Sequence, residues 1–316
     1  MNLHPLALWS IFNLIIAVML YIDLRIVSRE AHEVSIKEAA IWSAVWVTVS
    51  LLFCVWVGLS MGRQRALEFL AGYLIEKSLS VDNMFVFIMI FSYFRIPPLY
   101  QPRVLKWGIL GALVMRFVLI LAGVALLQAF HWIIYVFGLL LIVTGVRMAV
   151  EREREFEPAK NPALKLFRRL MPVTPYGMGE NRFFVNLDGR WHATALFVTL
   201  LVVEASDLVF AIDSIPAVLA ISTDPFIVYT SNAFAILGLR ALYFLLSGVM
   251  GLFAYLKVGV SVILVFVGTK MLLADVLHVP IAVSLSVIAG ILTVAIMASV
   301  LAKPRPPNSG QSSAES

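Results

Sequence analysis

The chain has 316 residues, of which 61% are hydrophobic and only 14% are charged, with a mean hydropathy of +0.94 and a formal net charge of +5. Soluble domains carry about 25% charged residues, so this composition excludes an ordinary soluble protein and indicates one that lies in lipid. The positive charge requires no nucleic acid as partner, because basic loops are attracted to the anionic headgroups of membrane lipid.

Nine apolar segments are long enough to cross a bilayer, which takes about 20 helical residues each. They predict an all-α polytopic membrane protein with about nine transmembrane helices, in one transmembrane domain that covers residues 1–303. The segments lie near residues 5–25, 38–60, 67–94, 105–128, 131–149, 192–220, 227–251, 256–275 and 279–301. The first has no basic run before it and no small-residue cleavage site after it, so we expect it to remain as a helix.

Lysine and arginine are divided unequally between the two sides that nine spans would create. The loops on one side hold 18 of these residues, whereas the other side has only Arg63 and Arg65. Basic loops remain in the cytoplasm. We therefore expect an integral protein of the plasma membrane, the inner membrane in a bacterium, with its N-terminus outside and its C-terminus in the cytoplasm.

Two stretches lie outside the predicted spans. A cytoplasmic loop over about residues 150–190 contains a short amphipathic helix that begins near Asn161 and a small β-hairpin with Asp188 and Gly189 at its turn. Residues 304–316 have few apolar side chains to bury and are expected to form a disordered cytoplasmic tail.

Five carboxylates lie well inside two of the apolar segments, the third and the sixth, and four of them recur in the same local order in the two halves. Glu-x5-Asp-Asn in the first half matches Asp-x5-Asp-Ser in the second. The residues are Glu76, Asp82 and Asn83 in the first half, and Glu204, Asp207, Asp213 and Ser214 in the second. A carboxylate at membrane depth costs at least about 2.5 kcal/mol on insertion scales, so an acid placed there is a candidate for handling a substrate or an ion.

The spacing limits how these acids could hold one cation. Six residues turn an ideal helix through about 600°, so Glu76 and Asp82 lie about 120° apart around the helix axis and about 9 Å apart along it. Either helices from both halves cross so that their acids meet, or each helix is broken locally. Pro216 favours a break in the second half, because its ring disrupts the hydrogen bond to the carbonyl of Ile212.

The donor atoms suit a hard divalent cation. Glu76, Ser80 and Asn83 are spaced i, i+4, i+7 and share one face of the helix. Carboxylate and amide oxygens suit Mg²⁺, Ca²⁺ or Mn²⁺ better than copper or zinc. Cys54 is the only cysteine in the chain, which excludes a disulfide within the chain and a thiolate metal site. Lys77 points about 100° away from Glu76, and we expect it to snorkel or to meet another acid.

The two halves also share landmarks beyond the acids. Arg116 and Arg240 lie inside the next apolar segment of each half, and a basic residue follows 31 and 30 positions later, at Arg147 and Lys270. The halves, about residues 64–150 and 191–278, start three spans apart, so they would enter the membrane from opposite sides. Such an inverted repeat is typical of secondary transporters whose site lies at the repeat interface.

The segments EKSLSVDNMFVF (76–87) and EASDLVFAIDSIPAVLAIS (204–222), with the opening WSIFNLIIAVMLYIDL (9–24), resemble the TerC family of integral membrane proteins, including its Alx branch. The resemblance covers nearly the whole chain. It implies the fold of the LysE-type transporter superfamily and export of metal ions, manganese above all. Older descriptions of the family concern tellurite resistance and redox modulation. The family's acidic positions correspond here to Glu76, Asp82, Asn83, Glu204, Asp207 and Asp213.

Three functions follow as alternatives. The first is a metal-ion exporter in which Arg116, Arg240, Ser80 and Ser214 support the acids and balance their charge. The second is a transporter of tellurite or another oxyanion that uses the two arginines, which five inner acids disfavour by repulsion. The third is a redox modulator that transports nothing, which a lone apolar cysteine disfavours. The acids could also serve only to pair helices with the arginines. No enzyme motif is present, so we expect a non-enzyme without a cofactor whose partner is a transported divalent cation.

Overall fold

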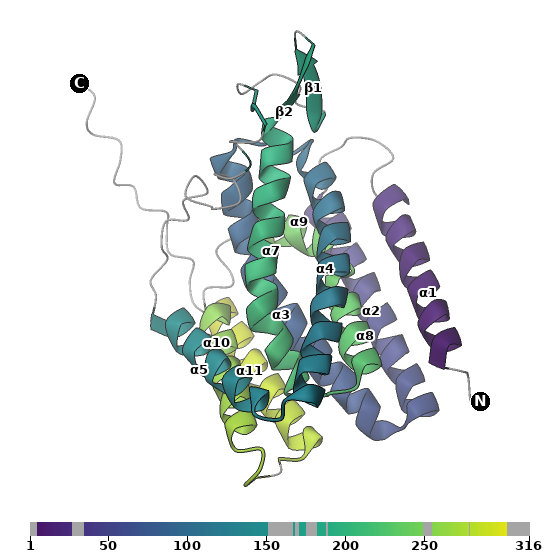
Figure 1. The fold of residues 1–316 in the computed structure, drawn as a ribbon, viewed down its shortest axis with the longest axis vertical. Helices are drawn as coiled ribbons and strands as arrows, with labels where there is room; N and C mark the ends of the chain where they lie inside the picture. Colours follow the sequence, from purple (N-terminus) through teal and green to yellow (C-terminus); the bar gives the residue numbers. More distant parts are fainter. Residues whose placement is uncertain are drawn as a thin grey trace.

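The structure, a computed structural model, describes residues 5–26, 35–150, 167, 171–174, 182–187, 189–248, 255–277 and 279–301. This part of the chain forms ten α-helices and one β-hairpin (Figure 1). The helices are α1 (Pro5–Ile26), α2 (Ile36–Met61), α3 (Arg63–Tyr93), α4 (Gln101–Ala129), α5 (Ile133–Val150), α7 (Ala195–Leu219), α8 (Pro225–Ile236), α9 (Leu239–Gly248), α10 (Leu256–Leu272) and α11 (Ile281–Leu301).

Each predicted apolar segment coincides with a helix, except that the seventh is divided into α8 and α9. Five of the described helices, α2, α4, α5, α7 and α11, are long and apolar enough to cross a membrane, and α8 with α9 would make a sixth across a 41° bend. The predicted number of nine is larger by three helices. The apolar part of α1, Leu8–Asp23, and α10, with 17 residues, are short, and Glu76, Lys77 and Asp82 lie within the apolar part of α3.

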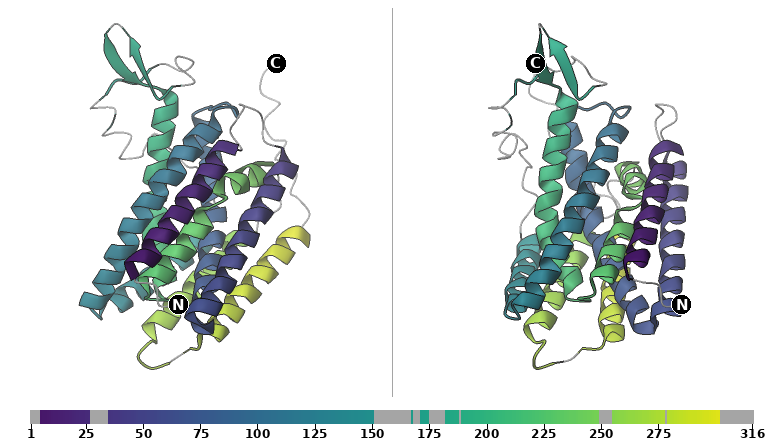
Figure 2. Two further views of the ribbon diagram at one scale, coloured as in Figure 1. Left: turned by 90° about the vertical axis from the view of Figure 1, so that its right-hand side faces the viewer. Right: turned by 45° about the vertical axis from the view of Figure 1, so that its right-hand side comes forward.

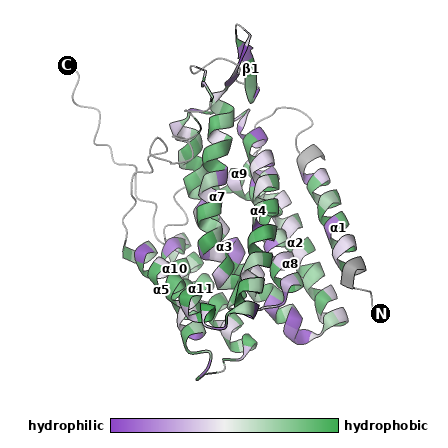
Figure 3. Cartoon of the chain, viewed as in Figure 1, coloured by the Kyte–Doolittle hydropathy of each residue, from purple (hydrophilic) through white to green (hydrophobic). Residues whose placement is uncertain are grey.

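The outer surface of the helices is apolar. Figure 3 shows that most residues of the helices are hydrophobic, whereas hydrophilic residues occur in β1, at several helix ends and at some positions inside the bundle, as on α3. Large side chains such as Leu14, Leu52, Leu59 and Val143 are exposed on α1, α2 and α5. Large apolar side chains that are exposed along several helices indicate that these helix surfaces face membrane lipid.

One helix lies at the centre of the bundle. Every residue of α8 from Phe226 to Ile236 is buried, and the helix contacts α2, α3 and α4. Its first turn is capped by Asp224, whose Oδ1 accepts hydrogen bonds from the amides of Phe226 (2.9 Å) and Ile227 (3.3 Å). A helix buried on all sides is expected to be mostly apolar. The exceptions in α8 include Thr230 and Ser231, whose hydroxyls donate to the carbonyls of Ile227 and Val228 within the helix.

A close helix crossing joins α5 and α10. A Cβ added at Gly145 would lie 2.8 Å from the carbonyl oxygen of Ser261, and one added at Gly268 would lie 2.6 Å from that of Gly138. Small residues permit this approach of two backbones. Because Gly138 lies opposite Gly268 and Gly145 lies opposite Ser261, the two helices are antiparallel.

The contacts of the two glycines correspond pair by pair. Gly268 follows Gly145 by 123 positions, and each neighbour of one glycine is related to a neighbour of the other by the same offset. The neighbours are Gly138, Leu141 and Ile142 around Gly268, and Ser261, Leu264 and Val265 around Gly145.

Two further helix pairs are parallel. Gly108 of α4 lies against Val203 of α7, and Gly123 lies against Leu219, so residue numbers rise together along both helices. Residue numbers also rise together along α3 and α8, whose contacts pair Arg65 with Asp224, Gly72 with Ser231 and Lys77 with Ala235. The pair of α4 and α7 and the pair of α8 and α3 therefore share the same parallel orientation. Figure 2 shows that α1 and α2 lie together at one side of the bundle.

The predicted hairpin is confirmed. Strand β1 (Phe184–Leu187) pairs antiparallel with β2 (Arg190–Ala193), and Gly189 adopts a φ of +78° at the turn. In all views the hairpin extends beyond the helices at the N-terminal end of α7 (Figures 1 and 2). The predicted amphipathic helix near Asn161, apart from Phe167, and the tail at residues 304–316 lie outside the described residues.

The predicted break beside Pro216 is wrong. Helix α7 continues through Pro216 to Leu219, and the carbonyl of Pro216 accepts a hydrogen bond from the amide of Ala220 at 2.9 Å. Proline removes one donor, and in the last turn of a long helix the remaining hydrogen bonds maintain the conformation. The discontinuity lies instead between α8 and α9, where Gly238 has a φ of +77°.

Candidate functional site

Three buried charges from three helices meet in the bundle. Arg116 of α4 donates from Nε to Oδ2 of Asp207 at 3.3 Å and from Nη2 to Oδ1 at 3.1 Å, and its Nη1 pairs with Glu76 of α3. Glu76, Arg116 and Asp207 are 0%, 1% and 6% exposed. The arginine fork suits such a two-sided contact because its donors have fixed directions.

This contact joins corresponding positions of the two acidic sequence motifs. Glu76 opens the first Glu/Asp-x5-Asp motif and Asp207 opens the second. The first of the two predicted solutions is therefore present, in which helices from both halves bring their acids together. Two carboxylates with one guanidinium leave one negative charge, and uncompensated charge in a low-dielectric interior is costly. The cluster is thus suited to receive additional positive charge.

The second acid of the second motif lies farther along α7. Asp213 is partly buried, and its Oδ1 accepts a hydrogen bond from Thr144 of α5 at 3.1 Å. Only the backbone of Asp82 is described. Ser80 and Ser214, which flank these acids, are buried, and among the described residues their hydroxyls lack a hydrogen-bond partner. Buried hydroxyls without a partner are suitable ligands for a bound ion or water.

Glu204 lies one turn before Asp207 on α7. A Cβ at Gly111 of α4 would overlap the Glu204 carboxylate, so the glycine provides the space that this acid occupies. The fifth acid therefore lies beside α4, near the cluster of Glu76, Arg116 and Asp207.

Arg240 does not join the five acids. Its Nη2 donates to the backbone carbonyl of Asp23 in α1 and lies 3.7 Å from the Asp23 carboxylate. The same carboxylate accepts a hydrogen bond from Nε1 of Trp46 at 3.1 Å. Asp23 was missed in the sequence, because it lies at the end of the first apolar segment, where an acid usually meets water.

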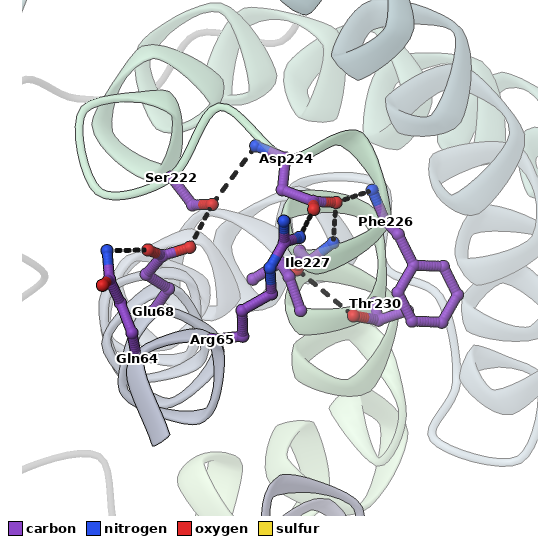
Figure 4. Close-up of polar contacts among 8 residues, drawn as sticks. All are labelled: Gln64, Arg65, Glu68, Ser222, Asp224, Phe226, Ile227 and Thr230. Atoms are coloured by element: carbon purple, nitrogen blue, oxygen red, sulfur yellow. Dashed lines mark hydrogen bonds and ion pairs between the residues drawn. The ribbon is translucent and has the colours of Figure 1, made fainter. Parts of the chain in front are cut away.

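A second polar cluster connects the N-terminal end of α3 to the α7–α8 connection (Figure 4). Arg65 pairs with Asp224. Glu68 accepts hydrogen bonds from Ser222 at 2.7 Å and from Gln64 at 3.2 Å. No sequence motif identified this cluster, because its α3 residues and its residues in the α7–α8 connection lie more than 150 positions apart in the sequence.

No complete metal-binding group is visible in the part of the chain that the structure describes. Among those residues, no three His, Cys, Asp or Glu side chains are arranged to hold a metal ion. Arg116 takes the space between Glu76 and Asp207, so these two acids face a fixed cation. Four of the six predicted ligands are divided here between the Arg116 cluster, the Thr144 contact and the surroundings of Gly111. Asn83 is buried on α3, and the side chain of Asp82 lies outside the described part of the structure.

Comparison with known proteins agrees with the resemblance seen in the motifs. Residues 61–306 match the integral membrane protein TerC family. An uncharacterized membrane protein of Myxococcus xanthus is 53% identical over 302 residues, which cover 96% of this chain and 94% of that protein. Proteins of Salmonella typhi and Escherichia coli K12, both provisionally named membrane-bound redox modulator Alx, are 51% and 50% identical.

These two alignments cover 92% of each chain for the Salmonella protein, and 90% of this chain and 91% of the other for the Escherichia protein. No solved structure matches. The family match covers more than half of the chain and includes both acidic motifs. The chain belongs to the TerC family of integral membrane proteins.

Proposed function

We propose that this protein exports divalent metal ions, with Mn²⁺ as the main substrate, through an intramembrane carboxylate site. The observation that carries the proposal is the meeting of Glu76 and Asp207, from equivalent positions of the two halves, at the buried guanidinium of Arg116. Oxygen ligands without sulfur or imidazole suit Mn²⁺ and related hard cations.

Two inverted three-helix repeats would move around this site. The antiparallel crossing of α5 and α10, with its corresponding glycine contacts, supports the repeat. The parallel packing of α4 on α7 and of α8 on α3 supports it further. On this basis α3, α4 and α5 correspond to α7, α8 with α9, and α10, and about nine helices cross the membrane with the N-terminus outside. Rocking of one repeat against the other gives alternating access.

Arg116 acts in this mechanism as an internal counter-charge. In the conformation described, it takes the place of a metal ion and neutralises part of the charge on Glu76 and Asp207. When a divalent cation arrives, Asp82, Asp213, Glu204 and the hydroxyls of Ser80 and Ser214 supply further oxygens, and the guanidinium withdraws because like charges repel. When the ion leaves, the arginine returns.

Transport of Mn²⁺ by purified protein in liposomes tests this proposal. Vesicles that contain a Mn²⁺-sensitive dye should show protein-dependent, saturable entry of Mn²⁺, and cells that express the protein should contain less cytoplasmic manganese than cells without it. Equal manganese content in both cell types, together with no flux in vesicles, would refute the proposal.

The names of the Alx relatives favour a second candidate, a redox role. In this chain the thiol available for such a role is Cys54, which is partly buried and donates to the carbonyl of Ala66 at 3.4 Å. A redox function through this thiol predicts that Cys54→Ser abolishes it, whereas the export mechanism predicts unchanged Mn²⁺ flux. Oxyanion transport would instead give saturable tellurite flux that requires Arg116 and not Asp82.

A further inference from the structure

The break between α8 and α9 exposes backbone carbonyls inside the bundle. The last four carbonyls of any helix lack partners in that helix, and at membrane depth they must be satisfied by other groups. Gly238 is required at this break, because its φ is +77° and a Cβ there would lie 2.6 Å from the Trp46 ring. The backbone cannot continue as a regular helix through this point.

The ammonium group of Lys77 satisfies two of these carbonyls. Nζ donates to the carbonyl oxygen of Ala235 at 3.3 Å and to that of Leu237 at 3.4 Å. We expected Lys77 to snorkel or to meet another acid. Its hydrogen bonds instead go to backbone carbonyls, and the acid that attracts it is Asp23 of α1. The partners of Lys77 are neutral carbonyls at the negative end of a helix dipole, which favours a cation.

The acid that attracts Lys77, Asp23, is already engaged by other groups. Asp23 binds Arg240 and Trp46, and it interacts with Lys77 only through longer-range attraction. Neutral carbonyls at a half-helix C-terminus, with a carboxylate in the vicinity, form the type of site at which transporters with discontinuous helices bind Na⁺.

We propose that the carbonyls of Ala235 and Leu237 form a monovalent-cation site that is filled by the covalently attached ammonium group of Lys77. The protein then carries its own cation at the helix break and needs no Na⁺ to stabilise it or to drive export. This inference rests on the proposed transport function for its consequence, whereas the cation site itself can be tested by stability alone.

Lys77 also connects the break to the acidic cluster. It follows Glu76 directly, so one turn of α3 contacts Arg116 of α4 through its carboxylate and the end of α8 through its ammonium group. A movement of α3 that released Arg116 would also draw Lys77 from its carbonyls. The built-in cation thus couples the acid site to the α8–α9 break.

Replacement of Lys77 by a small residue should convert the built-in cation into a requirement for a free one. Purified Lys77→Ala protein should unfold at a lower temperature than wild type in choline chloride, and NaCl, KCl or ethylammonium chloride should raise that temperature saturably. Wild type and the control Lys270→Ala, which removes a lysine at the end of α10, both retain Lys77. For each of these two proteins, the unfolding temperature should not depend on which of the four salts is present. A Lys77→Ala variant that responds to none of the cations would overturn the inference.

Lys77→Met fills the same space without a charge and keeps the test decisive if the alanine variant is not recovered. It should be less stable than wild type in every salt, and wild-type stability would contradict the inference. Export of Mn²⁺ by wild type should be equally fast in Na⁺ and in choline. A Na⁺ requirement would overturn the inference, whereas absence of Mn²⁺ flux in both salts would refute the export function and leave the stability result valid.

Discussion

Glu76 and Asp207, which are 131 positions apart in the sequence and open the two acidic motifs, contact the same guanidinium group of Arg116. The pair consists of one acid from α3 and one from α7, held by an arginine from α4. The two acids of a single motif, such as Glu76 and Asp82, lie about 120° apart around their helix axis and cannot both face one cation. The crossing of two helices therefore brings together what the spacing within each helix separates.

Removal of the arginine should be costly. Arg116→Gln leaves two buried carboxylates without a cation, and breaking a buried pair in this way costs roughly 3–5 kcal/mol. Adding Glu76→Gln should restore part of the lost stability, because it removes one of the two buried charges. Thermal unfolding in detergent would measure both effects, with exposed Arg63→Gln as control. An Arg116→Gln protein as stable as the control would contradict the assigned pairing.

The close crossing of α5 and α10 predicts a strong dependence on side-chain size. Gly268→Ala places a Cβ 2.6 Å from a backbone oxygen, and Gly145→Ala places one 2.8 Å from another, so the helices must separate. Gly290→Ala on α11 is the matched control, because its Cβ would meet nothing within 4 Å. We expect the first two variants to unfold at lower temperature than wild type and the third to be unaffected. Equal stability of all three would exclude the close crossing.

Some of this architecture could be predicted from the sequence. The helices follow from long apolar runs, and the hairpin follows from Asp188-Gly189. The choice of ion-pair partners could not be predicted, because it depends on which helices become neighbours. The buried role of Asp23 could not be recognised from the sequence, because the residue lies at the end of an apolar run. The break at Gly238 could hardly be recognised either, since a single glycine in an apolar segment is compatible with a continuous helix.

The cluster at the N-terminal end of α3 predicts a difference between two variants of one residue. Asp224→Ala removes both the cap of α8 and the pair with Arg65, and loss of a cap costs about 1 kcal/mol. Asp224→Asn retains an oxygen for the cap and removes only the charge, which at a partly exposed pair contributes about 0–1 kcal/mol. Denaturation should therefore rank wild type, asparagine and alanine in decreasing stability. An alanine variant more stable than the asparagine variant would contradict the capping role.

The membrane orientation can be tested at the two ends of α7. This helix has 25 residues and is about 37 Å long, so it can separate the hairpin from the α7–α8 connection. In a Cys54→Ser background, an impermeant maleimide added to intact cells should label Thr223→Cys and spare Asn186→Cys. Lysed cells should show labelling of both. Labelling of both sites in intact cells would place the two ends of α7 on the same side and remove the inverted repeat.

The final prediction concerns Asp82 and Asp213, the second acids of the two motifs. Asparagine keeps the size of the side chain and removes its charge, so each of Asp82→Asn and Asp213→Asn should abolish Mn²⁺ export if both acids hold the cation. Asp213→Asn can still accept the hydrogen bond from Thr144 through its amide oxygen, so its stability should remain near that of wild type. Asp275→Asn, which removes an exposed acid after α10, serves as control. In manganese-loaded cells, wild type and the control should lower cytoplasmic manganese and both site variants should not. Normal export by both variants at wild-type abundance would eliminate these carboxylates as the translocation site and leave the acids as pairs that hold helices together.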